Sequence, residues 1–380
     1  MRKYELTLSP DYVSDWSAVD AVRELFQNAL DQEVMQKDNK MFFGYGRRSD
    51  NVGVLYIGNK SSVLKAKTLL MGASTKRGNR DTIGKFGEGY KVATLVLLRL
   101  GFKVTFYNYG AREVWQPRFV KSRRYGGENI LTFFINDKWP WEKVPDNNLT
   151  IEIEGITPEL YKEIVETNLH LQDVGETIET SYGRILLEER YKGKVFVNGL
   201  WVCNYDPYLL GYDFKPAHIN IDRDRKLVSD LDLKWLSSKM WGATSDPRIV
   251  ELAAKNAADV QYVTFHLHQL PYDKRDELYD KAFDDFVKEN GTKAIPVTDQ
   301  EELMKVPPSY KPVIVSQSSR ALIKSSRKYI EPEPAVKLTF SRRLQEWFDN
   351  LSVRNQIKGD EVAMFEHILD ELEEVEAKWQ

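Results

Sequence analysis

The sequence has one cysteine, no long apolar run and no excess of positive charge, and each shortage excludes a class of protein. Cys203 stands alone among 380 residues, so neither a disulfide framework nor a multi-cysteine zinc site can form within one chain. Because Cys203 ends the mostly apolar run 195–203, we expect a small core residue rather than a nucleophile.

The sequence also lacks the long apolar segments expected of a membrane protein or of a secretory signal peptide. The longest apolar segment, 92–100, is shorter than the roughly 20 residues that cross a bilayer, and it contains Arg99. The first six residues lack the apolar stretch of a signal peptide. The net charge of −3 gives no bulk attraction to nucleic acid, although a local basic patch is left open. We expect a cytoplasmic protein with no membrane partner.

The composition, 42% hydrophobic and 29% charged, is typical of a globular protein with room for two or three domains. In the first part, helices begin at Ser17 and near Gly89 and end near residues 36 and 100. Alternating apolar residues predict strands there near 3–8, 41–45, 52–57, 103–107, 130–135 and 149–153. This mixture predicts an α/β layer of the α+β two-layer sandwich type.

The later part of the sequence continues to mix elements. A helical pattern at 158–171 precedes strands at 184–187 and 194–203, and Asn198-Gly199 in the second of these is a hairpin turn signal. Residues 293–324 follow a strand–helix–strand–helix pattern. After a stiff linker that contains two prolines, residues 338–380 are predicted to be helical.

Three polar residues form a stripe on the first predicted helix. Glu24, Asn28 and Asp31 are spaced at i, i+4 and i+7, which places them on one narrow face. An ordinary solvated face is the simpler interpretation of such a stripe. The alternative is chemical, because a carboxylate can align water for attack on a phosphate and an amide oxygen one turn later can bind Mg²⁺.

A glycine-rich turn precedes the second helix. Residues 83–91 carry Gly84, Gly87 and Gly89, which permit close approach of the backbone to a ligand. The start of a helix then offers free N–H groups to an anion such as phosphate. A plain flexible turn is the alternative. The spacing matches neither a P-loop nor a dinucleotide-binding turn.

Taken together, the helix 23–31, the segment Gly72-Ala-Ser-Thr-Lys76 and the glycine turn 83–91 resemble the GHKL (Bergerat-fold) ATPase superfamily. This superfamily includes gyrase-type topoisomerases, MutL mismatch-repair proteins, heat-shock chaperones of ninety kilodaltons, histidine kinases and MORC proteins. The MORC-like and heat-shock-like branches look most similar, and the resemblance covers roughly residues 1–160.

The resemblance implies roles for matching residues in binding ATP and Mg²⁺. Glu24 resembles the general base, Asn28 the Mg²⁺ ligand and Asp31 an acidic residue of the nucleotide pocket. The resemblance places in the lid over the phosphates Ser74, Thr75 and the catalytic candidate Lys76. The remaining expected cofactor-binding residues are Asn59, Gly84, Phe86, Gly87, Glu88, Gly89, Tyr90, Lys91 and Thr150.

The base end of the expected site departs from the family pattern. The family carries Asp-x-Gly-x-Gly after its second strand, and the Asp receives the adenine amine, whereas this chain has Gly58 there. Another side chain, a backbone carbonyl or water is then needed to read the base. Thr150 matches a threonine that supports the same site in the family, with Leu149 as an equally good alignment.

A second resemblance concerns residues 161–270, which look like the transducer domain that follows the ATPase in MutL-like and topoisomerase-like members. Within it, residues 219–226 resemble a catalytic loop, and Arg223 matches the arginine that reaches the γ-phosphate. A solvated charged turn is the alternative. The expected organisation is a nucleotide-binding domain at 1–160, the transducer-like domain at 161–270, a small α/β or helical extension at 271–330, and a linker with C-terminal helices at 331–380.

The expected function is Mg²⁺-dependent ATP binding with slow hydrolysis that drives a clamp-like or chaperone-like conformational cycle. The alternative is a nucleotide-gated scaffold for DNA or protein without significant turnover, which would suit a phage or bacterial conflict system. The resemblance also implies a nucleotide-dependent homodimer formed through the N-terminal strand. The client, protein or DNA, is not identified by the sequence.

Overall fold

The computed structural model describes residues 1–36, 38–70, 89–137, 148–219, 229–332, 340–349, 351 and 356–377. In these residues helices combine with mainly antiparallel sheets, which confirms the predicted α+β class. The chain divides into two compact units, Met1–Leu278 and Tyr279–Gln380. The finer boundaries expected near residues 160, 270 and 330 stay predictions.

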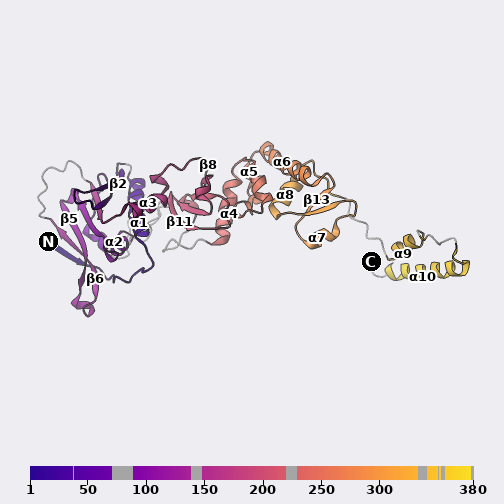
Figure 1. Cartoon of the computed structure of the whole chain (residues 1–380), viewed down its shortest axis with the longest axis horizontal. Helices are drawn as coiled ribbons and strands as arrows, with labels where there is room; N and C mark the ends of the chain where they lie inside the picture. The colour runs from indigo at the N-terminus through magenta and orange to yellow at the C-terminus, as the bar shows by residue number, and fades with distance from the viewer. Residues whose placement is uncertain are drawn as a thin grey trace. The chain divides into compact units, whose positions relative to one another are not determined.

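The first unit is built on a seven-stranded antiparallel sheet with the order β1-β6-β5-β4-β7-β3-β2. Figure 1 labels β2, β5 and β6 of this sheet. Its strands are β1 (Arg2–Glu5), β2 (Met41–Arg47), β3 (Gly53–Asn59), β4 (Lys103–Asn108), β5 (Glu113–Lys121), β6 (Asn129–Asn136) and β7 (Leu149–Glu154). Strand β7 lies between β3 and β4 in this sheet, so residues that are about 40 to 100 positions apart in the sequence pair side by side.

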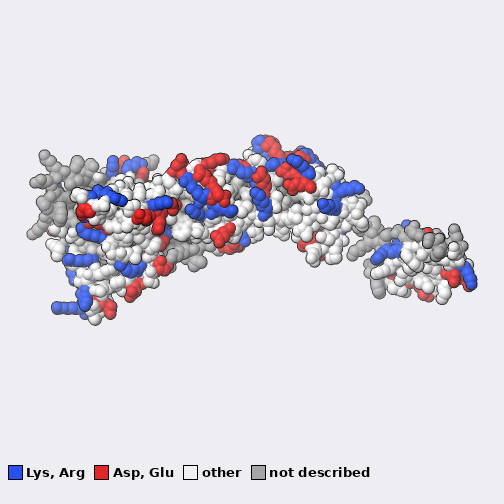
Figure 2. All heavy atoms as spheres, in the orientation of Figure 1, with Lys and Arg blue, Asp and Glu red and all other residues white. Residues whose placement is uncertain are grey.

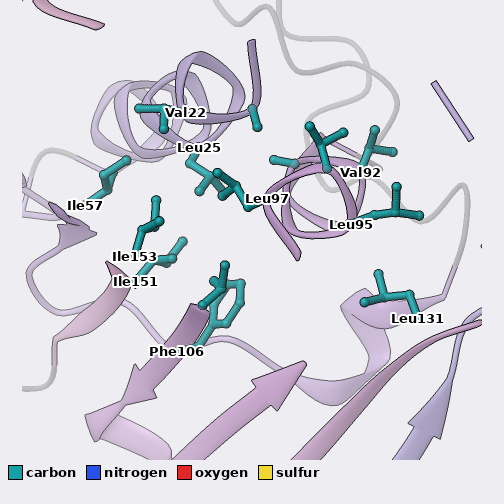
Figure 3. Packing of buried hydrophobic residues seen from close by; sticks show 14 of the residues in the cluster. Val22, Leu25, Ile57, Val92, Leu95, Leu97, Phe106, Leu131, Ile151 and Ile153 are labelled. Carbon is teal, nitrogen blue, oxygen red and sulfur yellow. The ribbon is translucent and has the colours of Figure 1, made fainter. Parts of the chain in front are cut away.

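Helices α1 (Ala18–Met35) and α2 (Gly89–Arg99) pack their apolar faces on this sheet (Figure 3). Ser17 caps α1 as the sequence predicts, because its hydroxyl accepts from the backbone N–H of Asp20 while the Asp20 carboxylate accepts from that of Ser17. Leu25 and Ile57 are fully buried between helix and sheet. Burial of such a side chain contributes about 1.5–3 kcal/mol, so this layer fixes the position of α1.

The strand β5 is missing from the sequence prediction, and Pro117 explains the omission. A proline within an apolar run argues against a central strand, because it cannot donate to the ladder. In the structure β4 pairs with β5 only through Glu113–Trp115. The other neighbour of β5, strand β6, pairs with it from Val114 to Lys121. Pro117 therefore lies where β5 has one neighbour, and its missing N–H is tolerated.

A second sheet in the first unit has the order β11-β10-β12-β9-β8. The predicted hairpin joins β10 to β11, and Asn198 and Gly199 both have positive φ, 50° and 76°, as a two-residue turn of this kind requires. The strands are β8 (Thr177–Thr180), β9 (Gly183–Leu186), β10 (Lys194–Val197), β11 (Leu200–Asn204) and β12 (Gly211–Phe214). The accompanying helices are α3 (Pro158–Glu166), α4 (Asp230–Trp241), α5 (Arg248–Ala254) and α6 (Tyr272–Asn290), the last of which continues into the second unit.

The second unit contains the predicted strand–helix–strand–helix pattern, with β13 and β14 paired in parallel. Its elements are β13 (Ala294–Val297), α7 (Gln300–Lys305), β14 (Lys311–Ile314), α8 (Gln317–Ser325), α9 (Phe340–Asp349) and α10 (Gly359–Ala377). Phe348 of α9 stacks on Phe365 of α10 with ring centroids 3.9 Å apart, so these two predicted C-terminal helices pack on each other.

The surface of the described residues mixes charges of both signs. On the face drawn in Figure 2, Lys and Arg are interspersed with Asp and Glu. Across the described ranges, no helix is long and apolar enough to cross a membrane.

Candidate functional site

The polar stripe on α1 is not a solvated face. Glu24 and Asp31 are only 2% and 1% exposed, and Asn28 is half-buried. Carboxylates are rarely buried to this extent unless a specific environment holds them, because desolvation of a charge costs several kcal/mol. The burial therefore removes the simpler of the two interpretations of the stripe.

Glu24 and Asn28 meet the first residue of α2. A Cβ built on Gly89 would lie 2.7 Å from Oε2 of Glu24 and 3.1 Å from Nδ2 of Asn28. Nδ2 of Asn28 also donates to the backbone carbonyl of Glu24 at 2.7 Å, which directs Oδ1 of the amide away from that carbonyl. The predicted helix stripe and the end of the predicted glycine turn thus come together, although they are about 60 residues apart in the sequence.

The first turn of α2 is fastened to residues 66–70, which include the short 3₁₀ turn η1 (Ala66–Leu69). Nζ of the fully buried Lys91 donates to the carbonyls of Thr68 at 2.9 Å and Leu70 at 2.6 Å. The hydroxyls of Tyr90 and Thr68 are 3.0 Å apart, and burial raises the pKa of Tyr90. Lys91, expected at the cofactor, holds backbone carbonyls in this structure.

Beside this junction lies a pocket of about 550 Å³. It is enclosed by α1, β3, the start of β7, residues 61–68 and Tyr90. Leu25, Ile57 and Ile151 give it an apolar wall, and Asn28 is the member of the α1 stripe that lines it. Ligand pockets typically hold 300–1,000 Å³ and combine apolar walls with a few polar groups, which is the composition seen here.

The side chains of β3, which lines the pocket, alternate between the two faces of the sheet. Leu55, Ile57 and Asn59 are on the face toward α1, and Asn59 is 4% exposed. Its Nδ2 donates to the carbonyl of Ala29 on α1 at 2.9 Å and to that of Asn39 at 3.1 Å. Asn59, at a position expected to bind the cofactor, is thus the polar side chain that β3 directs toward the pocket.

Gly58 belongs to the opposite face of β3 and contributes only backbone to the pocket. A Cβ there would overlap the carbonyl oxygen of Leu149 and lie 2.5 Å from Cζ of Phe42, so no side chain fits. Thr150 pairs with Gly58 across the sheet and shares that face. Its neighbours Leu149 and Ile151 line the pocket instead, and a supporting role for Thr150 stays a prediction.

The other predicted site residues lie outside the described residues. They are Ser74, Thr75, Lys76, Gly84, Phe86, Gly87, Glu88 and Arg223. Asp31 is buried on α1, yet it is not among the residues that line the pocket.

Lys65, Lys67 and Thr68 line the pocket and were not identified from the sequence. Both lysines are exposed, so their ammonium groups are available to an anion at the pocket mouth. The signal that could have identified them is their position, a Ser- and Lys-containing stretch directly after β3. Within the ranges that the structure covers, no group of three or more His, Cys, Asp or Glu side chains could hold a metal ion.

Helix α1 also contacts the second half of its unit. Nη1 of Arg23 donates to the carbonyl of Trp201 at 3.2 Å, and Phe26 stacks on His170 with ring centroids 5.8 Å apart. Nε2 of His170 in turn lies 2.7 Å from the carbonyl oxygen of Asn198 in the β10–β11 turn. The residues on either side of Glu24 are therefore tied to the hairpin that was expected to be transducer-like.

Comparison with known proteins gives distant similarities. No family model matches the chain. A protein of Mycoplasma pneumoniae described as uncharacterized is 24% identical over 234 residues, which is 60% of this chain and 92% of that protein. The B subunit of DNA gyrase from Myxococcus xanthus aligns at 9% identity over 66% of this chain and 93% of the gyrase chain, with a TM-score of 0.28. At that TM-score the likeness carries no argument about fold or function.

Proposed function

We propose that the chain binds ATP with Mg²⁺ in the pocket between α1 and β3 and hydrolyses it slowly, as a GHKL-type ATPase. The observation that carries this proposal is the junction of Glu24, Asn28 and Gly89 beside a 550 Å³ pocket with an apolar wall. A carboxylate can act as a base, an amide oxygen can bind Mg²⁺ and a helix start can bind phosphate, and here all three are adjacent.

The pocket fits a nucleotide in both size and distribution of polarity. A base can occupy the apolar part between Leu25 and Ile151, and phosphates can extend toward Lys65, Lys67 and the start of α2. The helix start supplies N–H groups and the positive end of the helix dipole. Charge-assisted contacts to phosphate come from the two lysines.

Mg²⁺ fits the same place through Asn28. Magnesium prefers oxygen ligands and commonly takes only one or two from the protein, with the rest from phosphates and water. The amide of Asn28, oriented by its bond to the Glu24 carbonyl, can provide one such oxygen. When bound, the ion would neutralise charge on the phosphate oxygens.

In the mechanism that we propose, Glu24 orients the attacking water and accepts its proton. Burial at the α1–α2 junction keeps the carboxylate in place, and the absence of a side chain at Gly89 leaves room beside it. Ser74, Thr75 and Lys76 would close over the phosphates, and the positive charge of Arg223 would reach the γ-phosphate. These four residues lie outside the described part of the chain and come from the resemblance.

The test is phosphate release from MgATP by the full chain and by Glu24→Gln. Wild type should release phosphate slowly, and the variant should lose this activity by about 10²-fold or more while it still binds MgATP. Glu33→Gln is the matched control, because Glu33 is a carboxylate on the same helix that does not line the pocket. Its phosphate release should equal that of wild type.

The outcomes separate the proposal from the alternatives. If wild type binds MgATP without phosphate release, the chain is a nucleotide-gated binding protein rather than an ATPase. If it binds no nucleoside triphosphate, the proposed function is wrong. A DNA client would be recognised by binding that weakens as salt rises, and a protein client by binding that is less sensitive to salt.

We also propose that nucleotide binding drives dimerisation through the N-terminal strand. In this structure β1 is an edge strand that pairs with β6 of its own chain, from Arg2 opposite Ile135 to Glu5 opposite Thr132. An edge strand keeps a row of backbone groups on its outer side available for pairing. Light scattering with and without a non-hydrolysable ATP analogue tests this, and a monomer under both conditions would contradict it.

A further inference from the structure

Helices α9 and α10 form an antiparallel hairpin that is held at both of its ends. The carboxylate of Glu376, at the end of α10, accepts from the hydroxyl of Ser341 at 2.6 Å and from the backbone N–H of Ser341 at 3.3 Å, at the start of α9. Phe348, near the end of α9, stacks on Phe365, near the start of α10. The faces that the two helices turn to each other are therefore defined by these four residues.

Each helix of the hairpin also carries an apolar stripe that the other helix does not cover. On α10, Met364, Ile368 and Val375 recur at i, i+4 and i+11, and on α9, Phe340 and Trp347 are seven residues apart. All five side chains are between 43% and 68% exposed. With about 3.6 residues per turn, each set lies along one line of its helix. Single exposed apolar residues are ordinary, whereas aligned ones on neighbouring helices mark an interaction surface.

The two stripes lie on the same side of the hairpin. At about 100° per residue, the stripe of α10 lies about 90° anticlockwise from the face toward α9, viewed from the N-terminus of α10. The stripe of α9 lies about 100° anticlockwise from the face toward α10, viewed from the N-terminus of α9. Because the helices run in opposite directions, rotations of the same sense bring both stripes to one side. We call these five residues the open face of the hairpin, and a third helix occupies such a face in a bundle.

The charges around the open face indicate the sign of its partner. Between Gly359 and Ala377, α10 has eight Asp and Glu residues and no Lys or Arg. By the helical period, Glu371 lies within the stripe of α10, and Asp360 and Glu361 border the first turn of that stripe on either side. The α10 of another copy would bring eight more carboxylates to this surface, whereas Lys and Arg of a partner would pair with those present.

We propose that the open face of the hairpin docks a basic amphipathic helix of a partner protein. The apolar side of that helix covers the exposed stripes of α9 and α10, and its Lys and Arg side chains pair with the carboxylates of α10. The stripe of α10 extends over about 16 Å, which corresponds to a partner helix of about four turns. The hairpin belongs to the second compact unit and the nucleotide pocket to the first, so this inference goes beyond the proposed function.

The test uses the full chain without nucleotide and a synthetic peptide of about 14 residues, made of leucine and lysine with the leucines at the helical period. Fluorescence anisotropy of the labelled peptide measures its affinity. Wild type should bind this peptide about tenfold more tightly or better than a scrambled peptide of the same composition, which has no apolar side. Because the two peptides carry the same charge, bulk electrostatic attraction cancels in the comparison.

Glu371→Lys and Glu373→Lys form a matched pair of variants. Both reverse one exposed charge on α10, but Glu371 lies in the open face and Glu373 lies on the opposite side of the helix. Glu371→Lys should weaken peptide binding about tenfold, and Glu373→Lys should weaken it less than about threefold.

A second matched pair tests the apolar contact. Ile368→Ser should weaken peptide binding about tenfold, because it removes an apolar side chain from the middle of the stripe. Met304→Ser should leave the affinity unchanged, since Met304 is an exposed apolar residue of α7 in the same unit, outside the hairpin. All four substitutions replace exposed side chains, so the fold is retained.

Several results would overturn the inference. Wild type that does not bind the amphipathic peptide, or binds both peptides equally, has no docking face of this kind. Equal effects of Glu371→Lys and Glu373→Lys would show that the attraction is not local to the open face. A dimer that Ile368→Ser converts to a monomer in light scattering would assign the face to a second copy, and binding to phosphatidylcholine vesicles that Ile368→Ser abolishes would assign it to a membrane surface. Since no nucleotide is present, failure of the proposed ATP site changes none of these results.

Discussion

Two glycines mark the two ends of the proposed site, and their surroundings differ in kind. At Gly58 the space for a side chain is taken by the Leu149 carbonyl and the Phe42 ring, which belong to the sheet itself. At Gly89 it is taken by the carboxylate of Glu24 and the amide of Asn28. The first glycine is required by the fold, whereas the second leaves room for the groups that would act on phosphate.

The two ends of the proposed site therefore differ in what holds them in place, backbone pairing at one end and side chains at the other. The base end is fixed by backbone pairing of β3 with β7 and by the two hydrogen bonds of Asn59. The phosphate end is formed by the side chains of Glu24 and Asn28 beside Gly89, and it continues into residues outside the described ranges. Substitutions at the base end should therefore affect stability first, and substitutions at the phosphate end should affect activity first.

Gly58→Ala should have the largest effect on stability. The new methyl group can be accommodated only if the β3–β7 backbone moves, so we expect a loss of about 1–3 kcal/mol in the free energy of unfolding. Gly44→Ala is the control, because a Cβ at Gly44 on the adjacent strand β2 meets nothing within 4 Å. Urea unfolding of both variants measures this, and equal midpoints would contradict the comparison.

Gly89→Ala should show the opposite pattern, with little change in stability and a large loss of phosphate release. Alanine favours a helix over glycine by up to about 1 kcal/mol, and the atoms that its Cβ meets are the ends of side chains. The unfolding free energy should therefore stay within about 1 kcal/mol of the wild-type value, while displacement of Glu24 lowers phosphate release about tenfold or more. Unchanged phosphate release in a folded variant would show that the position of Glu24 is not critical.

The smallest expected effect concerns Glu33, which ties the last part of α1 to the start of β2. Nζ of Lys40 donates to Oε1 at 2.8 Å and the backbone N–H of Met41 donates to Oε2 at 3.0 Å. These contacts, the lysine first, hold the pKa of Glu33 below its usual value. The stabilisation is therefore present above the unfolded pKa of about 4.3 and is lost as pH falls through the lower folded pKa.

Glu33→Gln measures this contribution. The variant should be less stable than wild type by about 0.5 kcal/mol at pH 7, since the pair is partly exposed, and the difference should shrink as the pH falls below about 4. A difference in unfolding free energy that does not change with pH would exclude the carboxylate contacts as its source.

The sequence predicts those elements that have local signals. Ser17 with Asp20 predicts the start of α1, and Asn198-Gly199 predicts the β10–β11 turn. Strand β5 was missed because the tolerance of Pro117 depends on where β4 stops pairing, which is a tertiary fact. The burial of Glu24 and Asp31 was likewise not decidable from spacing alone, since a solvated stripe has the same periodicity.

Asn59 illustrates how far local reasoning extends to the site. Strand alternation in Leu55, Ile57 and Asn59 would have placed this asparagine on the face toward α1, whereas motif matching drew attention to Gly58. The commitment of its Nδ2 depends on the carbonyls of Ala29 and Asn39, which are 30 and 20 residues away in the sequence. Only the folded chain shows these contacts of Asn59.

The most direct test of the central claim is the Mg²⁺ dependence of ATP binding to wild type and to Asn28→Ala. Alanine keeps the helix and removes the amide oxygen proposed for the ion. ATP should bind wild type at least several-fold more tightly with Mg²⁺ than with a chelator, and this enhancement should be lost in Asn28→Ala. No ATP binding by wild type, or an equal enhancement in the variant, would contradict the proposed site.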